Sequence, residues 1–120
     1  FYHLPSIFRG YCHRADGPQN VMGVSLKLVM FRTNVIKEVG GINEKFSFPY
    51  RDLDVCFKID EAGYDVILNT DVHVKLADNL NYNDEKSQKE FKKVWEDKLK
   101  KENKYYNANL VQSNGKFMFK

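Results

Sequence analysis

Residues 40–71 read GGINEKFSFPYRDLDVCFKIDEAGYDVILNTD, and this stretch decides the fold. Within it, apolar residues recur every three or four positions, which predicts a helix over 52–62. Gly63 ends this helix, and Gly40-Gly41 end a shorter one predicted over 33–39. Both helix ends are predicted from glycine, because glycine adopts at little energetic cost the left-handed conformation that ends a helix. We therefore expect two helices whose ends are fixed by the sequence itself.

Three apolar segments on either side of these helices predict strands. The run VSLKLVMF at 24–31 suits a buried strand, and YDVIL at 64–68 suits another. The segment VHVKL at 72–76 alternates between apolar and polar residues, which predicts a half-exposed strand. Residues 1–23 contain scattered proline and glycine, so we expect an irregular lead-in. The core over 24–76 is then a strand-helix-helix-strand unit.

The last third of the chain is charged and then aromatic. A polar loop at 77–83 precedes a long charged helix predicted over 84–101, in which Trp95 lies on the apolar stripe and is expected in the core. The stripe consists of Phe91, Val94, Trp95 and Leu99. The tail over 102–120 is expected to be extended, with a turn at Ser113-Asn114-Gly115.

Composition excludes several classes of protein. The 120 residues suffice for a single domain, with enough apolar residues, 42%, to form a packed core. The net charge of only +3 argues against a dedicated nucleic-acid binder, which needs a cation surplus. No apolar run approaches the ~18 residues that a membrane span requires. The two distant cysteines favour a reduced, intracellular protein, although one disulfide is an alternative. Because the chain begins at Phe1, we expect a piece of a longer protein.

Two acids at the start of the predicted helix are the candidate functional residues. Free N–H groups and the helix dipole stabilise an anion at Asp52 and Asp54, and Arg51 adds a neighbouring positive charge. A carboxylate held in this way can take the proton from an attacking hydroxyl. The alternative is that these acids only cap the helix.

The order of motifs resembles the C-terminal half of family 2 glycosyltransferases with a GT-A fold, of the kind that assembles bacterial polysaccharides. The resemblance runs from about Val21 to the end of the chain. It rests on GGINE (40–44), YRDLDVCFK (50–58), EAGY (61–64) and YYNANL (105–110). It implies a mixed α/β fold, the acceptor-side portion of a Rossmann-like domain with two or three helices.

The resemblance also implies a site. Asp52 stands where the family has the general base that deprotonates the acceptor sugar. Asp54 is expected to orient the loop or to bind the acceptor, and Tyr50 and Arg51 to contact substrate. Phe46 and Phe48 either stack on sugar rings or belong to the core, and the core is favoured.

Three departures from the family pattern bear on this site. Leu26 stands about where many members have a small glycine near the substrates. Arg51 replaces the acid that usually precedes the base, and Leu76 replaces a histidine that often binds the metal. The chain itself has no Asp-x-Asp other than Asp52-Leu53-Asp54 and no glycine-rich phosphate loop, so no metal ligand is predicted in it.

Partners and location follow from the same resemblance. The nucleotide-sugar and its Mg²⁺ or Mn²⁺ are expected to bind to an N-terminal nucleotide-binding half, which is the obligate partner of this chain. The glycan acceptor is expected to bind to the chain itself. The parent enzyme would work in the cytoplasm or at the cytoplasmic face of the membrane. The chain alone is expected to be inactive and to self-associate, because apolar surface is left uncovered. The alternative is a non-catalytic carbohydrate-binding or scaffold module derived from such an enzyme.

Overall fold

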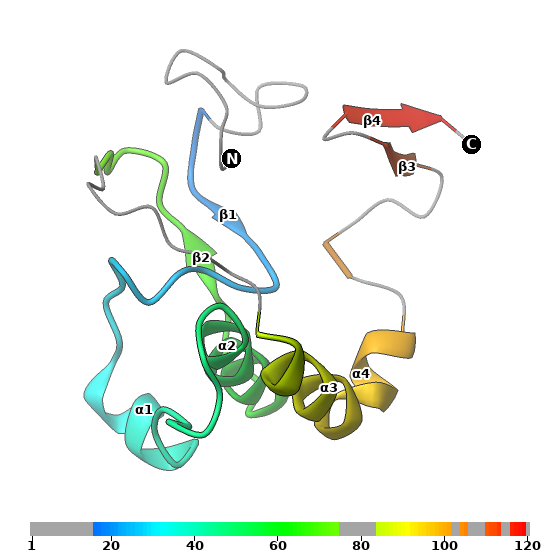
Figure 1. Cartoon of the computed structure of the whole chain (residues 1–120). Helices are drawn as coiled ribbons and strands as arrows, with labels where there is room; N and C mark the ends of the chain where they lie inside the picture. Colours follow the sequence, from blue (N-terminus) through cyan, green and yellow to red (C-terminus); the bar gives the residue numbers. More distant parts are fainter. Residues whose placement is uncertain (1–15, 75–83, 102–103, 106–109, 114–115, 120) are drawn as a thin grey trace.

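Helix α2 (Tyr50–Glu61) contributes residues to both apolar clusters of the structure. The computed structural model describes residues 16–74, 84–101, 104–105, 110–113 and 116–119 (Figure 1). They form, in chain order, β1 (Gln19–Asn20), α1 (Thr33–Glu38), α2, β2 (Ile67–Leu68), α3 (Glu85–Val94), α4 (Glu96–Lys100), β3 (Leu110–Ser113) and β4 (Lys116–Phe119). The prediction of a mixed α/β protein is confirmed.

Helices α1 and α2 end where the glycines predict. Gly63 has a φ of 85°, and the Tyr64 N–H donates to the Ile59 carbonyl at 3.1 Å, which closes the last turn of α2. At the end of α1, Gly40 has a φ of 78° and the Gly41 N–H donates to the Ile36 carbonyl at 2.9 Å. A side chain at Gly40 or Gly63 would strain this left-handed backbone.

Two apolar clusters lie on opposite sides of α2. One contains Val35 from α1 and Val66, which precedes β2, packed against α2. The other is aromatic and joins Phe46 and α2 to Phe91 and Trp95 of the C-terminal helices. The members from α2 are Val55, Cys56 and Ile59 in the first cluster and Phe57 in the second. Because α2 is apolar on two faces, it holds the α1 side and the α3 side of the molecule together.

The prediction of an irregular lead-in is wrong at Gln19–Asn20. This segment is β1, and it pairs antiparallel with Ile67–Leu68, so that Gln19 lies opposite Leu68. The Val21 N–H extends the pairing by donating to the Val66 carbonyl at 2.9 Å. The predicted strand over 64–68 is shorter than expected, because only its last two residues have a partner strand.

The predicted buried strand over 24–31 is also wrong. This segment is irregular, and its Leu28 and Met30 side chains are exposed. Its backbone N–H groups at Val24 and Leu26 bond to side chains of α2 and not to a neighbouring strand. The described part of the predicted strand at 72–76, residues 72–74, is likewise irregular, and the remainder lies outside the described residues.

The long charged helix predicted over 84–101 is broken at Trp95 into α3 and α4. Four helices are therefore present in the described residues, where two or three were expected. Trp95 is buried as predicted, whereas Val94 and Leu99 of the predicted apolar stripe are exposed. Phe91 and Trp95 pack against α2 in the aromatic cluster, whereas Val94 and Leu99 lie outside it.

The C-terminal tail forms the antiparallel hairpin of β3 and β4, in which Ser113 lies opposite Lys116. Strands therefore flank the predicted turn, whose residues 114–115 lie outside the described part, as does the predicted loop at 77–83. Among the residues described, no helix is long and apolar enough to cross a membrane.

Candidate functional site

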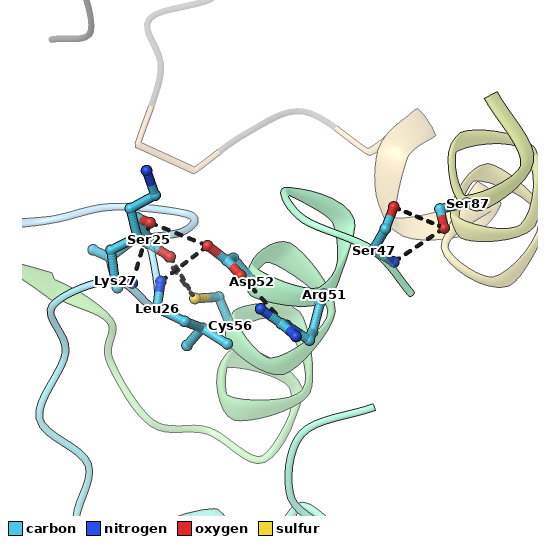
Figure 2. Close-up of polar contacts among 9 residues, drawn as sticks. Ser25, Leu26, Lys27, Ser47, Arg51, Asp52, Cys56 and Ser87 are labelled. Carbon is cyan, nitrogen blue, oxygen red and sulfur yellow. Dashed lines mark hydrogen bonds and ion pairs between the residues drawn. The ribbon is translucent and has the colours of Figure 1, made fainter. Parts of the chain in front are cut away.

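Asp52 lies in the first turn of α2 with its side chain buried, 4% exposed. Figure 2 shows this carboxylate directed at the backbone of a separate segment. Its Oδ2 accepts a hydrogen bond from the Leu26 N–H at 2.9 Å and another from the Ser25 hydroxyl at 3.1 Å. Two donors on one oxygen fix the orientation of the whole carboxylate, because it cannot rotate without breaking both bonds.

We call residues 23–27 the covering loop, because they lie across the first half of α2. The Val24 N–H lies 3.4 Å from Cys56 Sγ, which holds the loop one turn further along the helix (Figure 2). Gly23 permits this close approach, because a Cβ there would lie only 2.9 Å from Leu53 Cδ2. The loop therefore supplies both the donors to Asp52 and the lid over the α2 thiol.

The second carboxylate oxygen of Asp52 is left without a hydrogen bond from any residue in the described part of the chain. The nearest cation is the Arg51 guanidinium, whose Nε lies 4.0 Å from Oδ1. That Nε is also buried and has no hydrogen-bond partner among the described residues, although the Arg51 side chain as a whole is 40% exposed. Asp52 thus has one oxygen fixed by two donors and one buried oxygen that accepts no hydrogen bond from the described residues.

Asp54 lies on the side of α2 opposite to Asp52. Its Oδ1 accepts from the indole N–H of Trp95 at 2.9 Å, and its Oδ2 lies 2.7 Å from Lys58 Nζ. The ion pair satisfies the second oxygen, so both oxygens of this buried carboxylate are engaged. Residues two apart on a helix do not face one another. The structure therefore separates the two acids, and Asp54 joins α2 to the C-terminal helices.

The aromatic loop that precedes α2 is fixed on α3. The Tyr50 ring lies 5.5 Å from the Phe91 ring and is half-buried, and Phe46 is fully buried in the same aromatic cluster. The Ser47 N–H donates to the Ser87 hydroxyl at 3.0 Å (Figure 2). The core reading of Phe46 is confirmed, and Tyr50, predicted to contact substrate, packs its ring into the protein.

Asp84 completes this junction as the N-cap of α3. Its Oδ1 accepts from the backbone N–H groups of Lys86 and Ser87, and its Oδ2 from the hydroxyls of Ser47 and Ser87. These bonds, led by the one from Ser47, lower the pKa of Asp84 to about 2. The cap is strongest when Asp84 is ionised.

Cys56 has a place in the site that the sequence does not indicate. Burial raises the pKa of its thiol above the ordinary value, and the neighbouring charge of Asp52 acts in the same direction, against the opposing hydrogen bond from Val24. A thiol held protonated in this way is a poor nucleophile. Cys56 therefore acts as a contact for the covering loop and not as a reactive group.

A divalent cation has no matching set of ligands in the described residues. No three histidine, cysteine, aspartate or glutamate side chains converge there. The two acids of Asp52-Leu53-Asp54 are directed to opposite sides of α2, toward the covering loop and toward Trp95. They do not form a joint metal site.

No family model, curated protein or solved structure matches this chain. The resemblance drawn from the motifs at 40–64 stays a prediction. The structure shows a buried carboxylate at a helix start, with one oxygen fixed by two donors and the other without a hydrogen bond from any described residue. The donors that fix it, Ser25 and Leu26, lie 27 and 26 residues before Asp52. No sequence pattern pointed to them.

Proposed function

We propose that this chain is the acceptor-binding portion of an inverting glycosyltransferase of family 2, with Asp52 as its general base. The observation that carries the proposal is the asymmetry of this carboxylate. Oδ2 is fixed by Ser25 and Leu26, whereas Oδ1 has no hydrogen bond in the part of the chain that the structure describes. A base needs an oxygen that is held in place and still has a lone pair for the incoming proton.

In the proposed reaction, Oδ1 of Asp52 takes the proton of an acceptor sugar hydroxyl. The oxygen of that hydroxyl forms a bond to the anomeric carbon of the donor sugar. The bond from this carbon to the diphosphate oxygen breaks, and its electron pair leaves with the nucleoside diphosphate. Because attack and departure occur on opposite faces of the sugar ring, the anomeric configuration inverts.

The position of Asp52 in α2 supports this role electrostatically. Near the start of a helix, the helix dipole stabilises negative charge on a side chain. The two donors to Oδ2 also reduce reorganisation during the reaction, because they hold the carboxylate, and with it Oδ1, in one orientation before the acceptor binds. An ordinary N-cap differs, since its side chain bonds to the N–H groups of its own helix. Asp52, by contrast, accepts its hydrogen bonds at Oδ2 from the covering loop.

The proposal assigns the donor to a separate part of the enzyme. The nucleotide-sugar, and the Mg²⁺ or Mn²⁺ that would offset the diphosphate charge, belong to an N-terminal nucleotide-binding half that completes a GT-A fold. This chain supplies the acceptor side, and the enzyme would elongate a surface glycan at the cytoplasmic face of a bacterial membrane. The chain alone is inactive in this scheme.

A non-catalytic carbohydrate-binding module is the second candidate. One observation favours it: Oδ1 of Asp52 is buried, with Arg51 in the place where an acid would be expected beside the base. In such a module, the same carboxylate would accept a hydrogen bond from a bound sugar, and no bond would be made or broken.

One experiment separates the two candidates. The chain, alone and joined to a donor-binding half, is incubated with mixed nucleotide-sugars and a panel of oligosaccharides. Mass spectrometry then measures sugar addition, and NMR titration measures glycan binding. The glycosyltransferase predicts addition of one sugar mass by the joined protein. The module predicts binding without addition, and absence of both addition and binding contradicts both candidates.

A further inference from the structure

We infer that Arg51 Nε–H and Asp52 Oδ1 together form a binding site for one hydroxyl group of the acceptor. The inference rests on the proposed function and deepens it by giving Arg51 a role of its own. In this arrangement Arg51 is a positioning residue: it holds the oxygen of the hydroxyl while Asp52 receives its proton. The class of ligand is an alcohol, as in a sugar, and not a carboxylate or an amine.

The geometry of the two atoms leads to this conclusion. Nε and Oδ1 are 4.0 Å apart, which is too far for a hydrogen bond between them. Both atoms are buried, and neither has a hydrogen-bond partner within the described residues. Because neither atom is reached by solvent, an oxygen bonded to both at about 2.8 Å requires the Arg51 side chain to move outward from its present position.

A hydroxyl fits between these atoms better than other groups do. It donates one hydrogen bond and accepts others, so it can donate to the carboxylate and accept from the guanidinium at once. A carboxylate ligand would be repelled by Asp52, and an ammonium ligand by Arg51. Donation from Nε–H also favours the negative charge that develops on the oxygen as its proton leaves. The pair therefore selects and activates the same group.

Access to the pair depends on Arg51. The Asp52 side chain is held by the covering loop through Ser25 and Leu26. The Arg51 side chain, by contrast, is 40% exposed, and its contact with Asp52 is its one polar contact in the described chain. Rotation of Arg51 thus opens Oδ1 without disturbing the carboxylate. In the proposed complex, the Arg51 side chain moves outward to admit the alcohol, and Nε–H donates to the alcohol oxygen from this displaced position.

The direct test is the NMR signal of the Arg51 Nε–H group. The chain is labelled with ¹⁵N and titrated with methyl glucoside, methyl galactoside and methyl mannoside. Tetrahydropyran, which keeps the ring and lacks the hydroxyls, is the control ligand. Arg51→Gln removes the guanidinium, Arg51→Lys keeps the charge, and Arg32→Gln, on the exposed start of α1, is the matched control variant. Circular dichroism confirms that each variant is folded.

The inference predicts a saturable shift of the Arg51 Nε–H signal with at least one glycoside and none with tetrahydropyran. Glycoside affinity should fall at least about five-fold in Arg51→Gln and also in Arg51→Lys, because the ammonium does not reproduce the position of Nε. It should stay within about two-fold in Arg32→Gln. Glycoside binding that shifts the backbone amide signal of Asp52 and leaves the Arg51 Nε–H signal unmoved overturns this inference alone. Absence of glycoside binding overturns both this inference and the proposed function.

Discussion

The bond from Trp95 to Asp54 allows a quantitative prediction, because it joins two buried residues on different helices. Trp95→Phe keeps an aromatic ring in the core and removes the indole N–H, which lies 2.9 Å from Asp54 Oδ1. Asp54 is 1% exposed, so water cannot replace the lost donor. A hydrogen bond to a charged group contributes about 1.5–3 kcal/mol, and the smaller ring adds a packing loss of roughly 1–2 kcal/mol. We expect the free energy of unfolding to fall by about 3–4 kcal/mol.

A double-mutant cycle separates the hydrogen bond from the packing loss. The cycle combines Trp95→Phe with Asp54→Ala, and urea unfolding is followed by far-UV circular dichroism, since Trp95 is the single tryptophan. With a slope of about 1–3 kcal/mol per molar urea, the Trp95→Phe midpoint shifts by roughly 1–4 M. We expect a coupling energy of about 1.5–3 kcal/mol.

The reasoning is refuted by a coupling energy below about 0.5 kcal/mol, the level at which independent sites add. Such a value would mean that the Asp54 carboxylate is satisfied without Trp95. Lys58, whose Nζ lies 2.7 Å from the other oxygen, would then hold the acid alone. Lys58→Met is the control for this outcome, because it removes the cation and keeps most of the side-chain volume.

Two further predictions concern the contacts around the site. Folding lowers the pKa of Asp84 from 3.8 to about 2, chiefly through the hydrogen bond from Ser47. The stability that this carboxylate contributes is therefore complete above about pH 4 and is lost as the pH falls toward 2. Asp84→Asn should flatten the pH dependence of the urea midpoint in this range, and an unchanged slope would contradict the assignment. Gly23→Leu should lift the covering loop off α2, because a Cβ there would already lie 2.9 Å from Leu53 Cδ2 and 3.7 Å from Cys56 Cβ, and a longer side chain would meet both residues. Stability should fall by about 1–2 kcal/mol, and iodoacetamide labelling of the Cys56 peptide should become at least several-fold faster. Mass spectrometry measures this labelling, and equal rates in both proteins would show that the loop does not cover the thiol.

Local signals in the sequence were enough to predict the helices around the site. The stripe of α2 and the glycines at its end and at the end of α1 act within a few residues, and each specifies its structure without distant partners. The placement of Asp52 at a helix start followed directly from this pattern. Burial of Trp95 followed from the apolar positions around it.

Long-range pairing could not be predicted in the same way. The strand at Gln19–Asn20 exists because Ile67–Leu68 lies beside it, and its own two residues carry no strand signal. Residues 24–31 have the composition of a buried strand, yet the backbone at Leu26 bonds to Asp52 in preference to another strand. The predicted helix over 84–101 is interrupted at Trp95, whose indole N–H bonds to Asp54, a contact 41 residues away that no local pattern indicates.

The most direct test of the central claim is the rate of sugar transfer by Asp52→Asn in the protein joined to its donor-binding half. Asparagine keeps the size of the side chain and an oxygen for Ser25 and Leu26, but it cannot take a proton. General-base catalysis contributes about 10²–10⁴-fold, so the transfer rate at saturating substrates should fall by at least about 100-fold while donor binding is unchanged. Asp54→Asn, on the other side of α2, should lower stability and leave the rate of the folded enzyme within about three-fold. A transfer rate in Asp52→Asn equal to that of the unaltered protein would contradict the account.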